Sequence, residues 1–181
     1  MTPYLIVGLG NPGAPYRQTR HNLGFRVIDR LATTLGVAWK KEPDVISGLA
    51  TVDGDRIFLI KPQTFMNDSG TPVQRFVAFY KVPINHLLVI HDDLDLPFGE
   101  LRPAFDRGPA GHNGVTDIIA KLGSQAFHRL RIGIGSNRNV NISAEDYVLQ
   151  KFSATEDAQL NATNGPVAGA ADWVAGWIRS S

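Results

Sequence analysis

The sequence predicts a single-domain α/β protein with three layers, α/β/α, around a central mixed β-sheet. Apolar strand-like runs alternate with amphipathic helical segments along the chain, as in layered α/β folds. The runs at residues 4–7 and 87–90 are continuously apolar, which is typical of strands buried on both faces. Asp53-Gly54 separates two further strand-like runs and predicts a hairpin, so the sheet is expected to be mixed. With no repeat and no low-complexity linker, we expect residues 1–181 to form one domain.

The composition is that of a globular protein and excludes several kinds of chemistry. An apolar share of 43% in 181 residues is enough for one sizeable core. The absence of cysteine excludes disulfides, thiolate metal sites and a cysteine nucleophile. The net charge is only +1, but residues 140–181 hold five acids and two bases, so the rest of the chain carries +4. A basic face on the main body is therefore allowed, with scattered surface charge as the alternative.

The start of the sequence does not resemble a secretory signal, because no basic segment leads into a long apolar run. No stretch approaches the ~20 apolar residues that a membrane-spanning helix needs. We therefore expect a cytoplasmic protein with no membrane partner.

The first elements follow from periodicity and from capping residues. Apolar residues recur at helical spacing over residues 23–35, where Asn22 is the candidate N-cap and Gly36 the candidate stop. The strands of the predicted hairpin are residues 45–52 and 56–61. Each strand of this region is thus followed by a recognisable turn or helix.

A second helix carries Val73, Phe76, Val77 and Tyr80 on one face, and its start is ambiguous among Asn67, Ser69 and Thr71. The remaining predicted elements are a central strand at 87–90, an edge strand at 100–105, a loop at 106–111, a helix capped by Asn113 and ended by Gly123, a strand at 130–134, a polar loop at 136–143, and a helical tail at 154–179 broken at 165–166.

Three apolar strands each lead into a polar cluster. Val7 precedes the loop from Asn11 to His21, Ile60 precedes residues 64–67, and Ile90 precedes His91-Asp92-Asp93. If the strands are parallel, the clusters meet at the carboxyl edge of the sheet, where ligands of such folds bind. The helix start at His112 and Asn113 is placed to close the same crevice.

The loop Gly8-Leu9-Gly10-Asn11-Pro12-Gly13 matches the pattern G-x-G-x-x-G, but we reject a dinucleotide site. Pro12 removes an amide that a phosphate would use, and Pro15 prevents an early helix. The acid that should end the next strand is instead Asp29, inside the predicted helix.

His21 is the best candidate general base, with Asp92 or Asp93 as the carboxylate that would orient it. The alternative is a histidine that only packs near a helix start. There is no G-x-S-x-G elbow and no cysteine, so a His–Asp pair would activate water rather than a side-chain nucleophile.

Asn11, Asn67 and Asn113 carry amides suited to hold a peptide backbone or polarise a carbonyl, although helix capping explains Asn67 and Asn113 equally well.

A metal site built from His91-Asp92-Asp93 with His21 and His112 is the weaker alternative, because the usual ligand spacings are missing. A phosphate-binding surface is a further possibility, with solvated charge as its alternative; its candidates are Arg17, Arg20, Arg102, Arg107, Lys121, Arg129 and Arg131, the last two pointing to one face of a strand.

Taken together, these segments resemble the bacterial-type peptidyl-tRNA hydrolase family, over roughly residues 4–150. The matching segments, in family order, are Leu5-Ile6-Val7-Gly8-Leu9-Gly10-Asn11-Pro12-Gly13, Tyr16, Thr19-Arg20-His21-Asn22, Lys61-Pro62-Gln63-Thr64-Phe65-Met66-Asn67-Asp68-Ser69-Gly70, His91-Asp92-Asp93-Leu94-Asp95-Leu96-Pro97, Gly111-His112-Asn113-Gly114 and Phe127-His128-Arg129-Leu130-Arg131-Ile132-Gly133-Ile134-Gly135.

The resemblance implies hydrolysis of the ester between a peptide and the 3′ end of tRNA, by a cytoplasmic monomer that needs no cofactor and no metal. It implies that His21 activates water, that Asp92 supports its basic form, and that Asn11 helps to distinguish N-blocked from free aminoacyl-tRNA. It further implies contacts of the peptide and 3′ end with Tyr16, Phe65, Asn67 and Asn113, and of tRNA phosphate with Arg131.

The chain departs from the family in the segment before Gly111. The phosphate-binding lysine of the family falls on Ala104, so phosphate contact rests on Arg131 alone or on a substitute, Arg102 or Arg107. Pro109 is expected to stiffen this loop, and the acidic C-terminal part lacks the basic tail of some members. The alternative function is a non-catalytic RNA-binding module on the same fold, which would have no need of a base.

Overall fold

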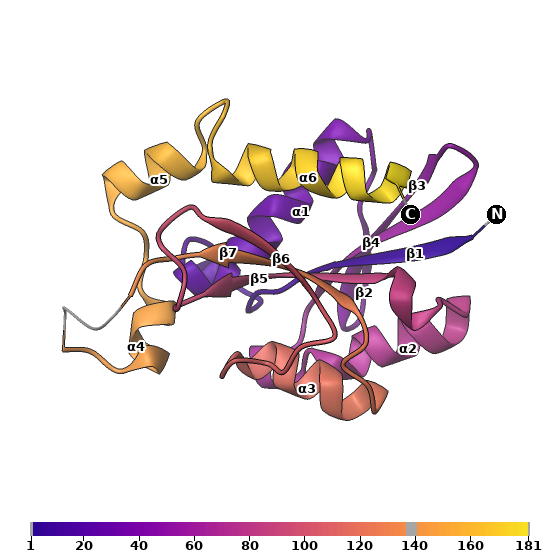
Figure 1. Ribbon diagram of the computed structural model, residues 1–181, viewed down its shortest axis with the longest axis horizontal. Helices are drawn as coiled ribbons and strands as arrows, with labels where there is room; N and C mark the ends of the chain where they lie inside the picture. Colours follow the sequence, from indigo (N-terminus) through magenta and orange to yellow (C-terminus); the bar gives the residue numbers. More distant parts are fainter. Residues whose placement is uncertain (1, 137–140, 181) are drawn as a thin grey trace.

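The computed structural model describes residues 2–136 and 141–180, and in these residues seven strands form one mixed sheet (Figure 1). Their order across the sheet is β2-β3-β4-β1-β5-β7-β6. The strands are β1 Pro3–Gly8, β2 Lys40–Glu42, β3 Val45–Val52, β4 Asp55–Pro62, β5 Leu87–Asp93, β6 Leu101–Phe105 and β7 His128–Gly133. The four central strands β4, β1, β5 and β7 are parallel, and the flanking strands pair antiparallel.

Helices cover both faces of the sheet, as Figure 1 shows, which confirms the predicted α/β/α layering. One layer contains α1 Leu23–Thr34, α5 Ala154–Leu160 and α6 Pro166–Ser180, and the other α2 Gly70–Tyr80 and α3 Asn113–Leu122; the short α4 is Ala144–Leu149. Four 3₁₀ turns are described: η1 Ala14–Tyr16, η2 Arg20–Asn22, η3 Met66–Asp68 and η4 Ile84–His86.

The central strands supply side chains to two separate cores. Ile6 and Ile90 belong to the cluster under α1 and α6, while Val7 and Val89 belong to the cluster under α2 and α3. Alternate residues of a strand point to opposite faces, so β1 and β5 need apolar residues at every position. This explains their unbroken apolar sequence. It also fixes the parallel register, in which Val7 lies between Ile60 and Val89, so the polar segments after these strands emerge at one edge.

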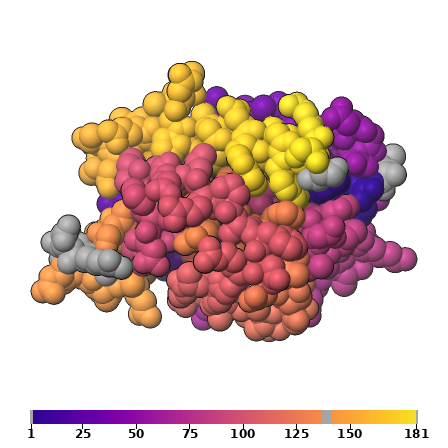
Figure 2. All heavy atoms as spheres, viewed as in Figure 1, coloured from indigo at the N-terminus to yellow at the C-terminus, as the bar shows by residue number. Residues whose placement is uncertain are grey.

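The C-terminal segment packs along the rest of the molecule rather than away from it, and in the space-filling view it lies against the middle of the chain (Figure 2). Gly99 makes this approach possible, because a Cβ there would lie 2.9 Å from Pro166 Cγ. Gly99 also has a φ of 79°, which favours glycine. No helix in the described residues has the length and apolar character needed to cross a bilayer.

Several boundaries are as predicted. Asp53 and Gly54 have positive φ values of 50° and 92°, as the tight hairpin turn requires, and Gly36 and Gly123 follow α1 and α3 with φ values of 64° and 66°. The helix break at residues 165–166 is also confirmed, and α2 begins directly after Ser69.

One capping prediction is wrong. The residue that caps α3 is His112, not Asn113: its Nδ1 accepts a hydrogen bond from the Val115 N–H at 3.3 Å. Asn22 is the N-cap of α1, as predicted, but its side chain makes no cap bond and binds the backbone of Asn11 instead.

Two further elements were not predicted. The strand β2 is a three-residue polar edge, and α4 begins at a Ser143 cap after the predicted polar loop. Residues 137–140 of that loop lie outside the described residues.

Candidate active site

The carboxylate of Asp92 binds the imidazole of His21. Asp92 lies near the end of β5, and His21 lies in η2, the turn that leads from the loop after β1 into α1. His21 Nδ1 is 3.0 Å from each carboxylate oxygen of Asp92. Both side chains are buried, His21 with 7% and Asp92 with 2% of its surface exposed. The structure therefore brings the predicted base and its predicted partner into direct contact.

This contact determines which nitrogen of His21 is basic. A carboxylate can only accept a hydrogen bond, so Nδ1 carries the proton and Nε2 keeps its lone pair. Burial lowers the pKa of His21, but the negative charge and hydrogen bond of Asp92 raise it, and the net direction is upward. His21 is thus an imidazole whose protonated form is stabilised by a fixed anion.

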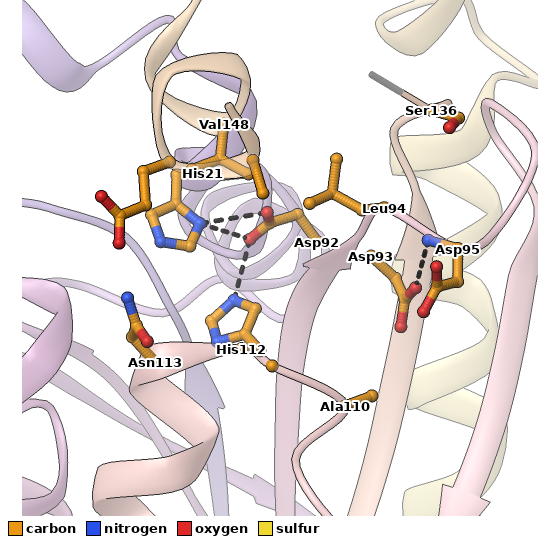
Figure 3. A pocket seen from close by; sticks show the side chains of 13 residues that line it. His21, Asp92, Asp93, Leu94, Asp95, Ala110, His112, Asn113, Ser136 and Val148 are labelled. Carbon is orange, nitrogen blue, oxygen red and sulfur yellow. Dashed lines mark hydrogen bonds and ion pairs between the residues drawn. The ribbon is translucent and has the colours of Figure 1, made fainter. Parts of the chain in front are cut away.

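Asp92 has a second imidazole partner, His112, whose role the sequence analysis missed. His112 Nε2 lies 3.0 Å from Asp92 Oδ1 (Figure 3), while its Nδ1 accepts the cap hydrogen bond of α3. His112 therefore carries its proton on Nε2, and this N–H donates a hydrogen bond to Asp92. Burial is the largest single effect and raises the pKa of Asp92, but the charges and hydrogen bonds of His21 and His112 together outweigh it, so the pKa lies well below the usual range. The Gly-His-Asn-Gly segment gave the position of His112 but not its partner.

The histidine and the acid beside Asp92 make their hydrogen bonds to groups other than His21 and His112. His91 Nδ1 donates to the backbone oxygen of Asp92 at 2.7 Å, and burial together with nearby His112 lowers the pKa of His91 well below its usual value. Asp93 instead binds Arg131, with Nε–Oδ2 at 2.8 Å. Of the five residues weighed as metal ligands, only His21, Asp92 and His112 converge, with ligand atoms within 4.8 Å of one another.

Asn11 is held at both its backbone and its side chain. Its Oδ1 accepts a hydrogen bond of 2.7 Å from the Met66 N–H, and Asn22 binds its peptide group. No described residue accepts a hydrogen bond from Asn11 Nδ2, so this amide is a free donor. Met66 also packs on Gly114, where a Cβ would lie 2.5 Å from the Met66 sulfur. Met66 therefore contacts the segments that carry Asn11 and Asn113, and it is itself the neighbour of Asn67 in the sequence.

The glycines before Asn11 serve the packing of α1 rather than a phosphate. A Cβ on Gly8 would lie 2.4 Å from the backbone oxygen of Gly24, and one on Gly24 would lie 2.4 Å from the oxygen of Ile90. These close contacts bring the start of α1 against β1 and β5, which places His21 over Asp92. Glycine is therefore required at residue 8 because α1 packs so closely on β1, and the match to the dinucleotide pattern does not indicate a dinucleotide site.

A cavity of about 290 Å³ opens at this edge of the sheet (Figure 3). Its lining includes His21, Asp92, His112 and Asn113, together with residues of α4 and of the loop before α3. The other predicted site residues, Asn11, Tyr16, Phe65, Asn67 and Arg131, do not line it. Tyr16 and Phe65 instead form an edge-to-face pair with centroids 6.1 Å apart, in which Phe65 is 59% exposed. Asn67 and Asn113 are exposed beside the buried Met66 and Gly114.

Known proteins match this chain in sequence and in fold. The family model described as peptidyl-tRNA hydrolase matches residues 5–180, nearly the whole chain. The chain belongs to the peptidyl-tRNA hydrolase family. A peptidyl-tRNA hydrolase of Geotalea daltonii is 47% identical over 161 residues, which are 88% of this chain and 83% of that protein. One of Bdellovibrio bacteriovorus is 44% identical over 87% of this chain and 84% of its own length.

A solved structure shows the same fold. The crystal structure of peptidyl-tRNA hydrolase from Acinetobacter baumannii superposes with a TM-score of 0.81 at 40% identity, covering 93% of this chain and 83% of that one. The sequence-based assignment to the peptidyl-tRNA hydrolase family is therefore confirmed.

Ala104, where the sequence analysis expects a departure from the family, lies on β6, where Ala104 pairs with Arg129 and Arg102 with Arg131. Arg129 is only 2% exposed and donates hydrogen bonds to the backbone oxygens of Arg107 and Gly108. Arg129 therefore holds the loop before α3 and does not belong to an exposed basic surface.

Arg20 is likewise buried, in a two-bond ion pair with Glu156 at 3.0 and 2.9 Å. Among the arginines considered for phosphate binding, Arg20 and Arg129 thus serve the fold.

Proposed function

We propose that this protein hydrolyses the ester bond between peptide and tRNA in peptidyl-tRNA, releasing free tRNA and peptide. The observation that carries the proposal is the buried contact of His21 with Asp92, which leaves a basic nitrogen at a cavity. Family membership supports the same substrate, since the relatives are named peptidyl-tRNA hydrolases. An ester with a good leaving hydroxyl needs only an activated water for this reaction.

His21 Nε2 takes a proton from water as the water oxygen attacks the ester carbonyl carbon. The imidazolium that forms is stabilised by the carboxylate of Asp92, which His112 holds in place. The tetrahedral intermediate then expels the ribose hydroxyl of tRNA, which receives the proton from His21 Nε2. The protein is thereby returned to its starting state, with an acid and an alcohol as products.

The amide donor of Asn11 is assigned to a carbonyl of the peptide part, because Oδ1 is already occupied by Met66. We further assign Tyr16, Phe65, Asn67 and Asn113 to the peptide and the 3′ end. Asn67 and Phe65 are exposed beside Met66, and Asn113 lines the cavity. Arg131, half-buried against Asp93, is assigned to a tRNA phosphate.

We infer that one chain is the functional unit, since all of these groups come from a single chain. The tRNA substrate argues for a cytoplasmic setting. A non-catalytic RNA-binding module would use the same surface, but it would gain nothing from an imidazole poised on a buried carboxylate.

The deciding experiment compares His21→Ala with His128→Ala on N-acetyl-aminoacyl-tRNA. His128 begins β7 at the opposite end of the sheet, so its replacement is a matched control. We expect His21→Ala to lose at least about a hundredfold in kcat, as for loss of a general base, and His128→Ala to stay near wild type. Full turnover by folded His21→Ala would overturn the mechanism, and tRNA binding without turnover by the wild type would favour the binding module.

A further inference from the structure

Asn22, the residue after His21, binds both the backbone N–H and the backbone carbonyl of Asn11. Asn22 Oδ1 accepts a hydrogen bond from the Asn11 N–H at 2.9 Å, and Asn22 Nδ2 donates one to the Asn11 oxygen at 2.9 Å. All of these atoms are buried, and Asn22 is 2% exposed. The side-chain amide thus pairs with the backbone as a neighbouring strand would, which fixes the two peptide groups that flank the Asn11 Cα.

The adjacent sequence makes room for this pairing. A Cβ on Gly10 would lie 3.0 Å from Asn22 Cγ and 2.8 Å from the ring of Phe25. A side chain at residue 10 would therefore push Asn22 away from Asn11. The second glycine of the loop is therefore explained by the close packing of Phe25 and Asn22, without a bound phosphate.

Asn22 and Met66 together leave Asn11 one free group. The backbone of Asn11 is fixed by Asn22, its Oδ1 is fixed by the Met66 N–H, and its Nδ2 has no partner among the described residues. The direction in which Nδ2 points is therefore set by these contacts. Since Asn22 follows His21 in η2, one rigid turn fixes both the base and the amide donor.

We propose that Asn22 is a positioning residue that sets selectivity, by holding the Asn11 amide at a fixed place relative to His21. This rests on the proposed function. An amide donor suits the carbonyl of an N-blocked aminoacyl group, and a free aminoacyl group has no such carbonyl at that place. Loss of the Asn22 contacts is expected to lower the turnover of N-blocked substrates more than that of free aminoacyl-tRNA.

The test measures kcat and KM for N-acetyl-aminoacyl-tRNA and for aminoacyl-tRNA with the wild type, Asn22→Ala and Asn22→Asp. Asn22→Ala removes both hydrogen bonds, and Asn22→Asp keeps the size and the acceptor but loses the donor. Asn161→Asp makes the same chemical change at an exposed helix end and is the control. Circular dichroism and the melting temperature show which variants are folded at the assay temperature.

We expect the ratio of kcat/KM between N-blocked and free substrates to fall roughly five- to hundredfold in both Asn22 variants, the range for unpairing a buried polar group. A double-mutant cycle separates positioning from mere stability. If Asn22 acts through Asn11, then Asn22→Ala has no further effect on this ratio in an Asn11→Ala background.

Three outcomes decide the question. An unchanged ratio in folded Asn22 variants, with only a lower melting temperature, would overturn the positioning role and leave the proposed function intact. Additive effects of the Asn11 and Asn22 replacements would overturn it as well. Absence of turnover by the wild type would overturn the proposed function itself, and the inference with it.

Discussion

The carboxylate of Asp92 accepts hydrogen bonds from two imidazoles at 3.0 Å, and this arrangement decides the chemistry at the scale of single residues. His112 cannot act as the base, because its Nδ1 is occupied by the Val115 N–H and its Nε2 faces Asp92. In His21, Nδ1 is bound to Asp92, and no described residue forms a hydrogen bond with Nε2. The two histidines therefore have different roles although they share one acid.

Replacing Asp92 by asparagine tests this division through pH dependence. The pKa of His21 is raised by Asp92 against the effect of burial, so removal of the charge leaves burial to lower it. Unprotonated His21 is the active form, so activity appears as the pH rises through this pKa. We expect the acidic limb of the kcat/KM profile of Asp92→Asn to move to lower pH and the plateau to fall by roughly ten- to a thousandfold. If the acidic limb of the profile stays at the same pH on the same substrate, Asp92 does not raise the pKa of the base, and the role given to His21 is contradicted.

At the scale of elements, the 3₁₀ turn η2 is the centre of the site, because its three residues each contact a different part of the chain. Arg20 binds Glu156 at the start of α5, His21 binds Asp92 on β5, and Asn22 binds the loop after β1. Arg20 is also stacked between the rings of Tyr147 and Phe152. The turn has its own backbone hydrogen bond, from the Asn22 N–H to the Thr19 oxygen, and these side-chain contacts fix its place in the molecule.

The edge strand β6 carries Ala104, where we expect the chain to depart from its family, and Ala104→Lys tests the effect of that departure. A lysine there would place a cation on β6 opposite Arg129, two positions from the pair of Arg102 with Arg131. We expect KM for peptidyl-tRNA to fall and the dependence of KM on salt to steepen by about one counterion, because one more phosphate is neutralised. Thr51→Lys adds the same charge on β3, across the sheet, and is the control. Equal effects of both changes would mean that only net charge matters.

Those elements that carry a hydrophobic period were predictable from the sequence, and the contacts between them were not. Continuous apolar runs indicated β1 and β5, and Asp53-Gly54 indicated the hairpin, since burial and turn geometry act locally. The elements η2, β2 and α4 are too short or too polar to show a period. The meeting of His21 with Asp92 followed from parallel strands. The partners of His112 and Asn22 are 20 and 11 residues away, and no local rule identifies them.

At the scale of the whole molecule, the layers enclose a site whose charged groups are paired with groups of the same chain. The charge of Asp92 is stabilised by hydrogen bonds from His21 and His112, and Arg131 forms an ion pair with Asp93. The site therefore needs no metal ion to keep its carboxylates ionised. All of the groups assigned to catalysis come from one chain.

Two measurements test whether the site works without a metal ion and whether a single chain is active. We expect the activity on N-acetyl-aminoacyl-tRNA to be unchanged, within about twofold, by 1,10-phenanthroline in buffer that keeps Mg²⁺ for the tRNA. We also expect light scattering to give the mass of one 19.7 kDa chain for the active species. Loss of activity that Zn²⁺ restores would instead assign a metal to His21, Asp92 and His112. Activity confined to a heavier species would show that one chain is not enough.

The ion pair of Arg20 with Glu156 joins residues 136 positions apart, next to the proposed base. A chain leaves the ribosome from its N-terminus, so the turn that holds His21 emerges well before its partner in α5. β1 likewise pairs with β4 and β5, which both follow it in the chain. The full set of contacts that holds η2 therefore forms only after α5 has been synthesised.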